Sequence, residues 1–545
     1  MATSDTCQSR LTRRHCGRPD SGEVGADALT WWSPEIEDVT PLSKSKSHGD
    51  ARRGIPSTAF NSHGQSDFNN DMGRQHELRS ATVSQLPPLA EAEILFEHFS
   101  RVMHPTLGVL HLPSIRTLLR DAYAAAAVGG DLDVSCLLLL LSVFAGAAMV
   151  WTPELGVSLA ASEAQAIAAY KQYVRQALAM LDHARQPLKP STMSLAAIAT
   201  LSHVVANHDV LTSQSNVMLL RSRCVMLARQ LGVDSLDTHV KRAARQIQRP
   251  NMIEIEVQRR VWWFIVSSDW LAGFSGGSQD GTYTFLPRFM HVDLPSDIDD
   301  ECLTPDGFSK EPSPKRPTGM SSFIQRTKLS FIQRIKLAGL CRDIVDVLPS
   351  VPWAADGIDY GTILAVDQRM EKFLSNLPPF FKLDADFDRA QAASHDETPW
   401  IAVQALGINF SLQVRRCRLH RPYHLLSTKE PTYEYSRTMY IRSARNALGL
   451  AHAMDELATN SGLKASPYWI VRQNVFTAGL TLATNVSHNL DLPNVDVQGQ
   501  SRHAAYKAPD LADSDALWSE FLSVAPDFDD AQWLSLVTFP EMAEA

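Results

Sequence analysis

Apolar residues along most of the chain recur every three or four positions, which places them on one face of an α-helix. The first long example runs from Ala92 to Met103 and ends before Pro105, where a helix interior cannot continue. Strand-like alternation is scarce, and only 281–287 (GTYTFLP) favours extended backbone. The pattern therefore predicts an all-α protein.

Further apolar faces of this kind follow along the chain. They cover 220–231, where Gly232 stands as a C-terminal stop, 257–271, and, after residue 400, 401–419 and 435–457. We predict one helix for each.

Polar and apolar composition divides the chain into three parts. Residues 1–85 are rich in Ser, Asp, Asn, Gly, Arg and His without an apolar period, which predicts disorder. A helical domain is expected over 86–508, and an acidic tail over 509–545.

Two features interrupt the helical domain. Residues 304–317 (TPDGFSKEPSPKRP) have the composition of an exposed loop. Soon afterwards SFIQRTKL at 322–329 is followed by SFIQRIKL at 330–337. Two copies are too few for a solenoid, so we interpret them as a duplication inside one helix.

The segment 134–153 (VSCLLLLLSVFAGAAMVWTP) carries no charge and is long enough to span a membrane. Ser135, Thr152 and Pro153 make its ends polar or helix-breaking, and no second such segment exists in the sequence. We favour a helix buried in a large α domain over a membrane span.

Composition agrees with an intracellular globular protein. Of the 545 residues 44% are hydrophobic and 20% charged, which suits a chain with a large core. The seven cysteines include no CxxC pair, and the first residues lack an apolar signal region. We expect reduced thiols and no secretion.

The sequence contains one motif typical of hydrolases. Residues 273–277 (GFSGG) satisfy G-x-S-x-G, whose serine needs a strand before it and a helix after it. Here the preceding residues have helical period and the following ones are loop-like. We interpret the motif as a glycine-rich helix exit, and predict that the chain is not an enzyme.

Histidine pairs offer no metal site. His203 and His208 are five residues apart, which places them on different faces of a helix. His420 and His424 have a suitable spacing, but Pro422 between them is expected to stop the helix.

Two stretches are basic. Lys241, Arg242, Arg245 and Arg249 fall within about 100° of one helix face. This face could contact phosphates, although a solvated face is the favoured interpretation. The basic residues of 315–342 spread around their helix and form no stripe.

The net charge of −9 equals the nine acids of the last 36 residues, 510–545, which contain no Lys or Arg. Aromatic residues alternate with these acids at Trp518, Phe521, Phe528 and Trp533. Acidic and hydrophobic alternation is typical of activation segments that fold on a partner. The alternative is a closing helix that packs on the domain.

Five segments in order resemble the fungal-specific transcription factor domain, the helical middle region of fungal zinc-cluster regulators. They are FEHFSRVMHPTLGVLH (96–111), LRSRCVMLARQLGV (220–233), QRRVWWFIVSSDWL (258–271), the run 276–303 that ends in HVDLPSDIDDECL, and RCRLHRP (416–422). The resemblance extends from about residue 90 to about residue 460.

The most specific of these segments holds the family's characteristic residues. They are Arg259, Arg260, Trp262, Trp263 and Asp269, with Pro295 in the run that follows. At least one of the two tryptophans should be largely buried, because an exposed aromatic pair is unfavourable. Asp269 lies among apolar neighbours and should have a hydrogen-bonding or cationic partner.

The sequence departs from the family at its beginning. Family members usually carry six cysteines that hold two zinc ions and present a basic helix to DNA. Here only Cys7 and Cys16 precede the domain, and two thiolates do not complete a tetrahedral site. Zinc is thus expected in the family while its ligands are absent here, and no other cofactor is visible.

The resemblance implies a fungal transcriptional regulator in the nucleus, controlling a metabolic or secondary-metabolite gene set through partners. Those partners are the transcription machinery or another regulator, with a homo- or heterodimer possible and DNA contacted weakly or indirectly. Two alternatives stay open: a small-molecule sensor that binds an effector without binding DNA, and a truncated zinc-cluster factor.

Overall fold

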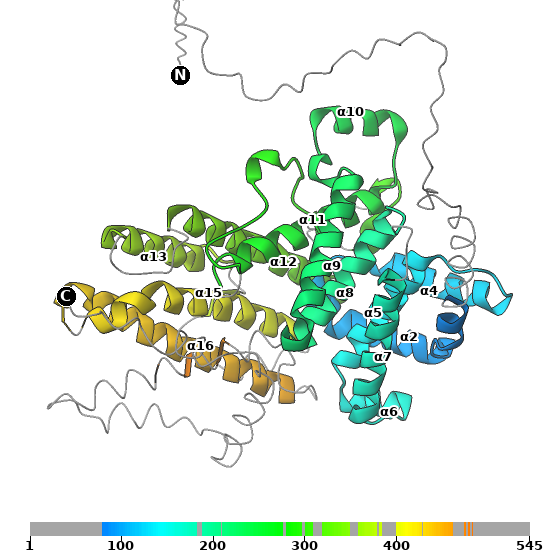
Figure 1. Cartoon of the computed structure of the whole chain (residues 1–545), viewed down its shortest axis with the longest axis horizontal. Helices are drawn as coiled ribbons and strands as arrows, with labels where there is room; N and C mark the ends of the chain where they lie inside the picture. The colour runs from blue at the N-terminus through cyan, green and yellow to red at the C-terminus, as the bar shows by residue number, and fades with distance from the viewer. Residues whose placement is uncertain are drawn as a thin grey trace, which may run out of the picture. The chain divides into compact units, whose positions relative to one another are not determined.

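The computed structural model describes residues 79–182, 188–208, 210–275, 279–296, 300–308, 319–348, 358–378, 381–383, 399–427 and 429–460, with a few isolated residues up to 482. Its long elements are helices, which confirms the all-α prediction (Figure 1). They are α2 (Leu89–Val102), α3 (His104–Leu107), α4 (Leu112–Ala127), α5 (Val134–Met149), α6 (Pro153–Leu159), α7 (Glu163–Asp182), α8 (Thr192–His208), α9 (Val210–Gln230), α10 (His239–Gln248), α11 (Met252–Ala272), α12 (Gly319–Val347), α13 (Tyr360–Ser375), α15 (Pro399–Leu426) and α16 (Glu434–Asn460).

Helix α5 is the centre of the largest hydrophobic core. Nearly all of its residues are buried, and α2, α7 and α8 pack around it. Asp133 caps its first turn by accepting a hydrogen bond from the Ser135 amide at 2.9 Å. The uncharged segment is therefore a buried helix, as favoured, because an all-apolar helix needs partners on every side. In the described part of the chain, no helix combines the length and apolarity that a membrane crossing needs.

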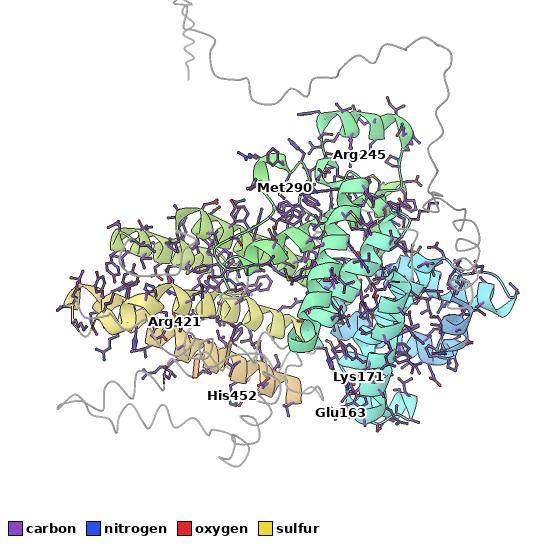
Figure 2. All side chains as sticks on the ribbon, in the orientation of Figure 1. Glu163, Lys171, Arg245, Met290, Arg421 and His452 are labelled. Atoms are coloured by element: carbon purple, nitrogen blue, oxygen red, sulfur yellow. The ribbon has the colours of Figure 1, made fainter. Side chains whose placement is uncertain are left out.

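A second group of helices follows α11. Helix α12 packs against α11 and α15, while α15 packs along α16 and against α13. Figure 2 shows Arg421 on α15 and His452 on the neighbouring α16, and both side chains project from this pair. The duplicated octads lie within α12, so the prediction that one helix contains both is confirmed.

The structure differs from the sequence-based expectation at three local features. Helical backbone already covers 79–84, inside the segment predicted to be disordered. Residues 281–286 form no strand, because a carboxylate of α11 binds their amides, as described below. The two short strands instead pair Leu303–Thr304 (β1) with Gly307–Phe308 (β2), at the start of the predicted loop.

Helix α15 also continues through Pro422, which we had expected to stop it. Proline removes a backbone hydrogen bond and clashes with the preceding turn, at a cost of about 3 kcal/mol. His420, Tyr423 and His424 on both sides of it are buried. Burial of these side chains stabilises the helix enough to offset the local cost.

The tryptophan pair behaves as predicted. Trp262 is 1% exposed and packs edge-to-face on Phe285, whereas Trp263 is only partly buried. Trp262→Ala should therefore lower the free energy of unfolding by about 3–5 kcal/mol, and Trp263→Ala by less. Trp262→Phe should also cost less than Ala, since the Trp262 indole N–H has no partner in the described residues. Urea denaturation would measure all three, and equal costs at both tryptophans would contradict the packing.

Candidate functional site

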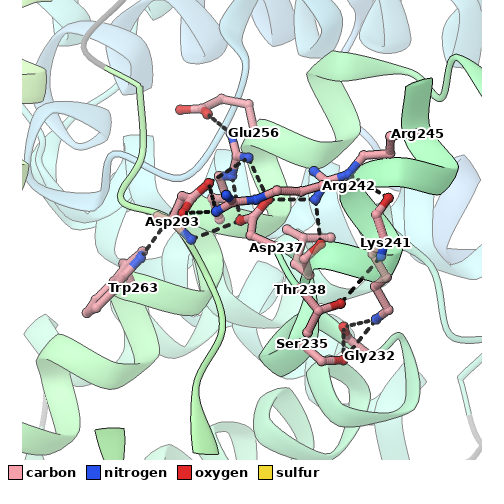
Figure 3. Close-up of polar contacts among 12 residues, drawn as sticks. Gly232, Ser235, Asp237, Thr238, Lys241, Arg242, Arg245, Glu256, Trp263 and Asp293 are labelled. Atoms are coloured by element: carbon pink, nitrogen blue, oxygen red, sulfur yellow. Dashed lines mark hydrogen bonds and ion pairs between the residues drawn. The ribbon is translucent and has the colours of Figure 1, made fainter. Parts of the chain in front are cut away.

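A carboxylate between α9 and α11 collects the polar contacts of the most specific sequence segment. The Asp237 side chain, only 1% exposed, accepts hydrogen bonds from Arg245 Nη2 at 2.7 Å and from Arg259 Nε and Nη2 at 2.9 and 2.7 Å. It also accepts one from the Asp293 amide at 2.9 Å (Figure 3). One buried carboxylate thus connects α10, α11 and the segment that follows α11.

The electrostatics of this group are those of a satisfied buried ion pair. Burial alone would raise the pKa of Asp237, but the hydrogen bonds from Arg259, the Asp293 amide and Arg245 outweigh it and lower the pKa. Burial likewise opposes the charge of Arg259, and its bonds to Asp237 raise its pKa. The cluster is therefore charged and paired at neutral pH.

We call residues 281–296 the return segment, because they run back along α11 after it ends. Trp263 Nε1 donates to the Asp293 carbonyl at 2.9 Å, and Arg242 pairs with the Asp293 carboxylate at 2.6 Å. Glu256 accepts from the Ser296 amide at 2.9 Å. Side chains of α10 and α11 hold this end of the segment.

The other end of the return segment is bound by the end of α11. Asp269 Oδ2 accepts from the Thr284 and Phe285 amides at 2.7 and 3.1 Å, which confirms that this carboxylate has partners. Trp270 Nε1 donates to the Phe285 carbonyl at 2.9 Å. These contacts fix the backbone in the region that the sequence had predicted to be β-like.

Arg260 extends the network toward α4. Its guanidinium contacts Glu256 at 3.2 Å, Asp300 at 2.9 Å and the Leu110 carbonyl at 3.2 Å. Asp300 in turn accepts from the Leu112 amide at the start of α4 at 3.1 Å. Pro295 between these contacts is buried. Arg259, Trp263 and Asp269 thus contact the return segment, whereas Arg260 joins α11 to Asp300 and to the start of α4. We call this set of contacts the structural lock.

The predicted basic face lies on α10, a helix without buried residues. Lys241 donates to the Gly232 carbonyl at 2.7 Å, and Arg242 and Arg245 pair with Asp293 and Asp237. Arg249 is exposed at the end of the helix. Most of the face thus contacts the chain itself, and phosphate binding there stays a prediction.

A second buried ion cluster joins α13, α15 and α16. Arg416 and His420 contact Asp367 at 2.5 and 3.0 Å, and the Tyr435 hydroxyl donates to it at 2.6 Å. His420 also contacts the Ser436 hydroxyl at 2.8 Å. His424, by contrast, packs on the Tyr440 ring. The two histidines serve different contacts rather than one metal site.

The other candidate chemical groups are structural. His203 contacts the Thr106 hydroxyl at 3.1 Å, and burial lowers its pKa to about 3, so its ring is neutral. Burial raises the pKa of the Cys136 and Cys224 thiols to about 11 and 12, which leaves them protonated. Ser275 follows helix α11 instead of a strand and donates to the Ala272 carbonyl.

The expectation that zinc ligands are absent stays a prediction, since it concerns Cys7 and Cys16. Among the described residues, no three His, Cys, Asp or Glu side chains converge as metal ligands. Cys7 and Cys16 lie outside the described residues, as do the proposed activation anchors Trp518, Phe521, Phe528 and Trp533.

The comparison with protein families decides the assignment. The model of the fungal specific transcription factor domain matches residues 96–375, which include α11 and the return segment. The chain belongs to this family. Within the fungal specific transcription factor domain, Arg259 and Trp263 contact the return segment, and Arg260 binds Glu256 and Asp300.

Three curated relatives are similar over much of the chain. The protein named "Probable transcription factor lepB" of Aspergillus flavus is 32% identical over 68% of this chain and 64% of its own length. The agnestins biosynthesis cluster transcription factor AgnL11 of Paecilomyces divaricatus is 28% identical over 76% and 57%. Transcription factor TAS2 of Pyricularia oryzae is 26% identical over 68% and 46%. The aligned part thus spans about half to two-thirds of each relative.

Sequence analysis missed the acidic partners of the arginine pair. Asp237, Glu256, Asp293 and Asp300 were not singled out, although an acidic run follows the basic helix segment. The available signal for this pairing was that 258–260 is basic whereas 291–303 is acidic. It could not say which acid meets which arginine, because that depends on how the return segment folds back.

Asp237 should make stability depend on pH. Its pKa is lower in the folded protein than the unfolded value of about 3.9, so its stabilisation is present above that pH and is lost as the pH falls below it. Asp237→Asn should cost about 3–5 kcal/mol at pH 7, because it leaves buried guanidinium groups unpaired. The difference in the free energy of unfolding between Asp237→Asn and the wild type should become smaller below about pH 4.

The matched control is Asp293→Asn, since the Asp293 side chain is 49% exposed and forms a surface pair. It should cost about 0–1 kcal/mol. Chemical denaturation of both variants between pH 3 and pH 8 would measure the difference. A constant gap between Asp237→Asn and the wild type over this range would contradict the assignment.

Proposed function

We propose that the chain is a fungal transcriptional regulator that acts in the nucleus on a metabolic or secondary-metabolite gene set. Its membership of the fungal specific transcription factor domain family carries this proposal. The printed names of its relatives support it, since all three are transcription factors and one belongs to a biosynthesis cluster.

We propose a regulatory role for the domain. The described acids and arginines of the lock bind one another, and the buried thiols described above are protonated. Helix α10 nevertheless lies at the edge of the described structure with Val240 and Ile247 exposed. We propose that the domain works through contacts with a second copy, another regulator or the transcription machinery.

We propose activation as one of the two roles open to the acidic tail, the other being a helix that packs on the domain. Residues 510–545 fused to a foreign DNA-binding domain should activate a reporter, because their aromatic groups can enter a groove of a partner while the acids keep them solvated. Changing Trp518, Phe528 and Trp533 to Ala should remove activation at unchanged charge. The control changes Ser519, Ser523 and Ser535 to Ala and should remain active.

Reporter output and fusion-protein level would be measured together. Equal activation by the aromatic triple variant and the parent would refute the role of these anchors. A fragment that never activates, combined with unfolding of the domain when the tail is deleted, would favour the packing alternative.

DNA binding by the chain alone should be weak and insensitive to sequence. Specific recognition needs a rigid element that reaches base edges, and phosphate contacts alone do not discriminate between sequences. Purified full-length protein should bind a random-sequence DNA pool with an affinity that falls steeply with salt, and should contain almost no zinc. Enrichment of one motif at physiological salt, or about two zinc ions per chain, would overturn this proposal.

A further inference from the structure

Helix α10 lies with its polar side toward the domain. Lys241 donates to the Gly232 carbonyl at 2.7 Å (Figure 3). Arg245 donates to the Leu236 carbonyl at 2.6 Å, in addition to its bond to the Asp237 carboxylate at 2.7 Å. Polar contacts, rather than apolar packing, therefore attach this helix to the rest of the structure.

The apolar residues of α10 form a stripe on the other side of the helix. Val240, Ala243 and Ile247 fall within about 60° of the helix circumference, and we call them the α10 stripe. The stripe lies nearly opposite Lys241 and Arg245, and Val240 and Ile247 are 79% and 85% exposed. Figure 1 shows α10 at the edge of the described structure. A surface helix ordinarily buries its apolar face, so this orientation indicates a partner outside the described residues.

Basic side chains lie along one side of the α10 stripe. Arg242 pairs with Asp293 at the surface, whereas Arg249 is exposed and forms no ion pair with an acid of the described residues. The sequence between Asp237 and Glu254 contains no acid at all. The surface around the stripe therefore favours a partner that is both apolar and acidic.

We propose that residues 510–525 of the acidic tail pack on the α10 stripe. This segment (DLADSDALWSEFLSVA) contains four acids and no Lys or Arg, so its charge is complementary to that of α10. Pro526 follows it and would end a helix there. In such a helix, four apolar residues would share about 100° of one face: Leu511, Trp518, Phe521 and Leu522.

A second copy of α10 suits the stripe less well than the tail does. Two copies would bring the basic sides of both helices together, and like charges repel each other. Helix α10 also has only 10 residues, whereas a stable interface between two proteins takes about 20–30 residues from each of them. A partner tethered in the same chain needs less contact area, because the tether raises its effective concentration.

The length of the chain permits this contact. The 27 residues of 483–509 separate the last described residues from the proposed segment. Fully extended, they span at most about 90 Å. That is about twice the length of α12, the longest described helix with 29 residues.

The contact does not depend on the proposed function, because it is defined by binding between two parts of one chain. Trp518 and Phe521 buried on α10 could not enter the groove of another protein at the same time. Docking and activation therefore exclude each other in the full chain. The tail fused to a foreign DNA-binding domain lacks α10, so its activity is a separate question.

Hydrogen–deuterium exchange of the full chain tests the contact. The amides of 511–525 should exchange about tenfold or more slowly than those of a synthetic peptide of 510–525. The double variant Val240→Gln/Ile247→Gln should lose this protection, because polar side chains replace the exposed apolar ones of the stripe. Exchange of the α5 amides, in the largest core, should stay unchanged and reports that the domain is folded.

The matched control replaces two valines that are as exposed as those of the stripe. Val128 at the end of α4 and Val157 on α6 are each 84% exposed, and Val128→Gln/Val157→Gln should keep the protection of 511–525. Arg249→Glu should lower the protection by about fivefold, because it replaces an attractive charge with a repulsive one.

Three outcomes would overturn the proposal. The first is that 511–525 exchanges equally fast in the full chain and in the peptide. The second is that Val240→Gln/Ile247→Gln retains the protection, since the tail would then pack elsewhere. The third is that 511–525 exchanges as fast as the peptide while the α10 amides become protected with rising protein concentration, which would identify a second copy as the occupant.

Discussion

The arrangement around α11 depends on the hydrogen bonds and ion pairs of the buried Asp237 carboxylate. It binds Arg245 and Arg259 together with the Asp293 amide, so α10, α11 and the return segment share one anion. Two guanidinium groups in a partly buried place need such a partner, because an unpaired buried charge is far more costly than a paired one. The return segment has almost no regular secondary structure, and the Asp237 contact holds its backbone in place.

The same reasoning applies to residues 258–271, the segment with the most specific family resemblance. This segment is helical, whereas the return segment that it binds is irregular. The return segment has few backbone hydrogen bonds to strands or helices of its own, so its amides and carbonyls need acceptors and donors from elsewhere. Asp269 and Trp270 supply them from the last turn of α11, and Trp263 from an earlier turn. The spacing of these residues reflects the path of the segment that they bind.

Helix positions were predictable because their signal is local. The apolar period of 257–271 and the charge-free run of 134–153 each determine which faces must be buried, and the structure follows both. Predictions failed where contacts between residues far apart in the sequence determine the local structure. Pro422 lies inside α15 because its neighbours are buried against other helices, and 281–286 forms no strand because Asp269 binds its amides.

The candidate sites were harder to predict for the same reason. The signature residues could be found from the sequence, and a partner for Asp269 could be required on physical grounds, but Asp237 and Asp300 could not be matched to their arginines.

The buried arginines of this fold differ in the acceptors that they bind. Arg259 and Arg260 form ion pairs with carboxylates of the chain itself, and these pairs stabilise the fold. Arg334 and Arg415 instead donate to hydroxyl and carbonyl oxygens of neighbouring helices. Ion pairs therefore fix the irregular return segment, whereas neutral acceptors join the arginines of α12 and α15 to the helices beside them.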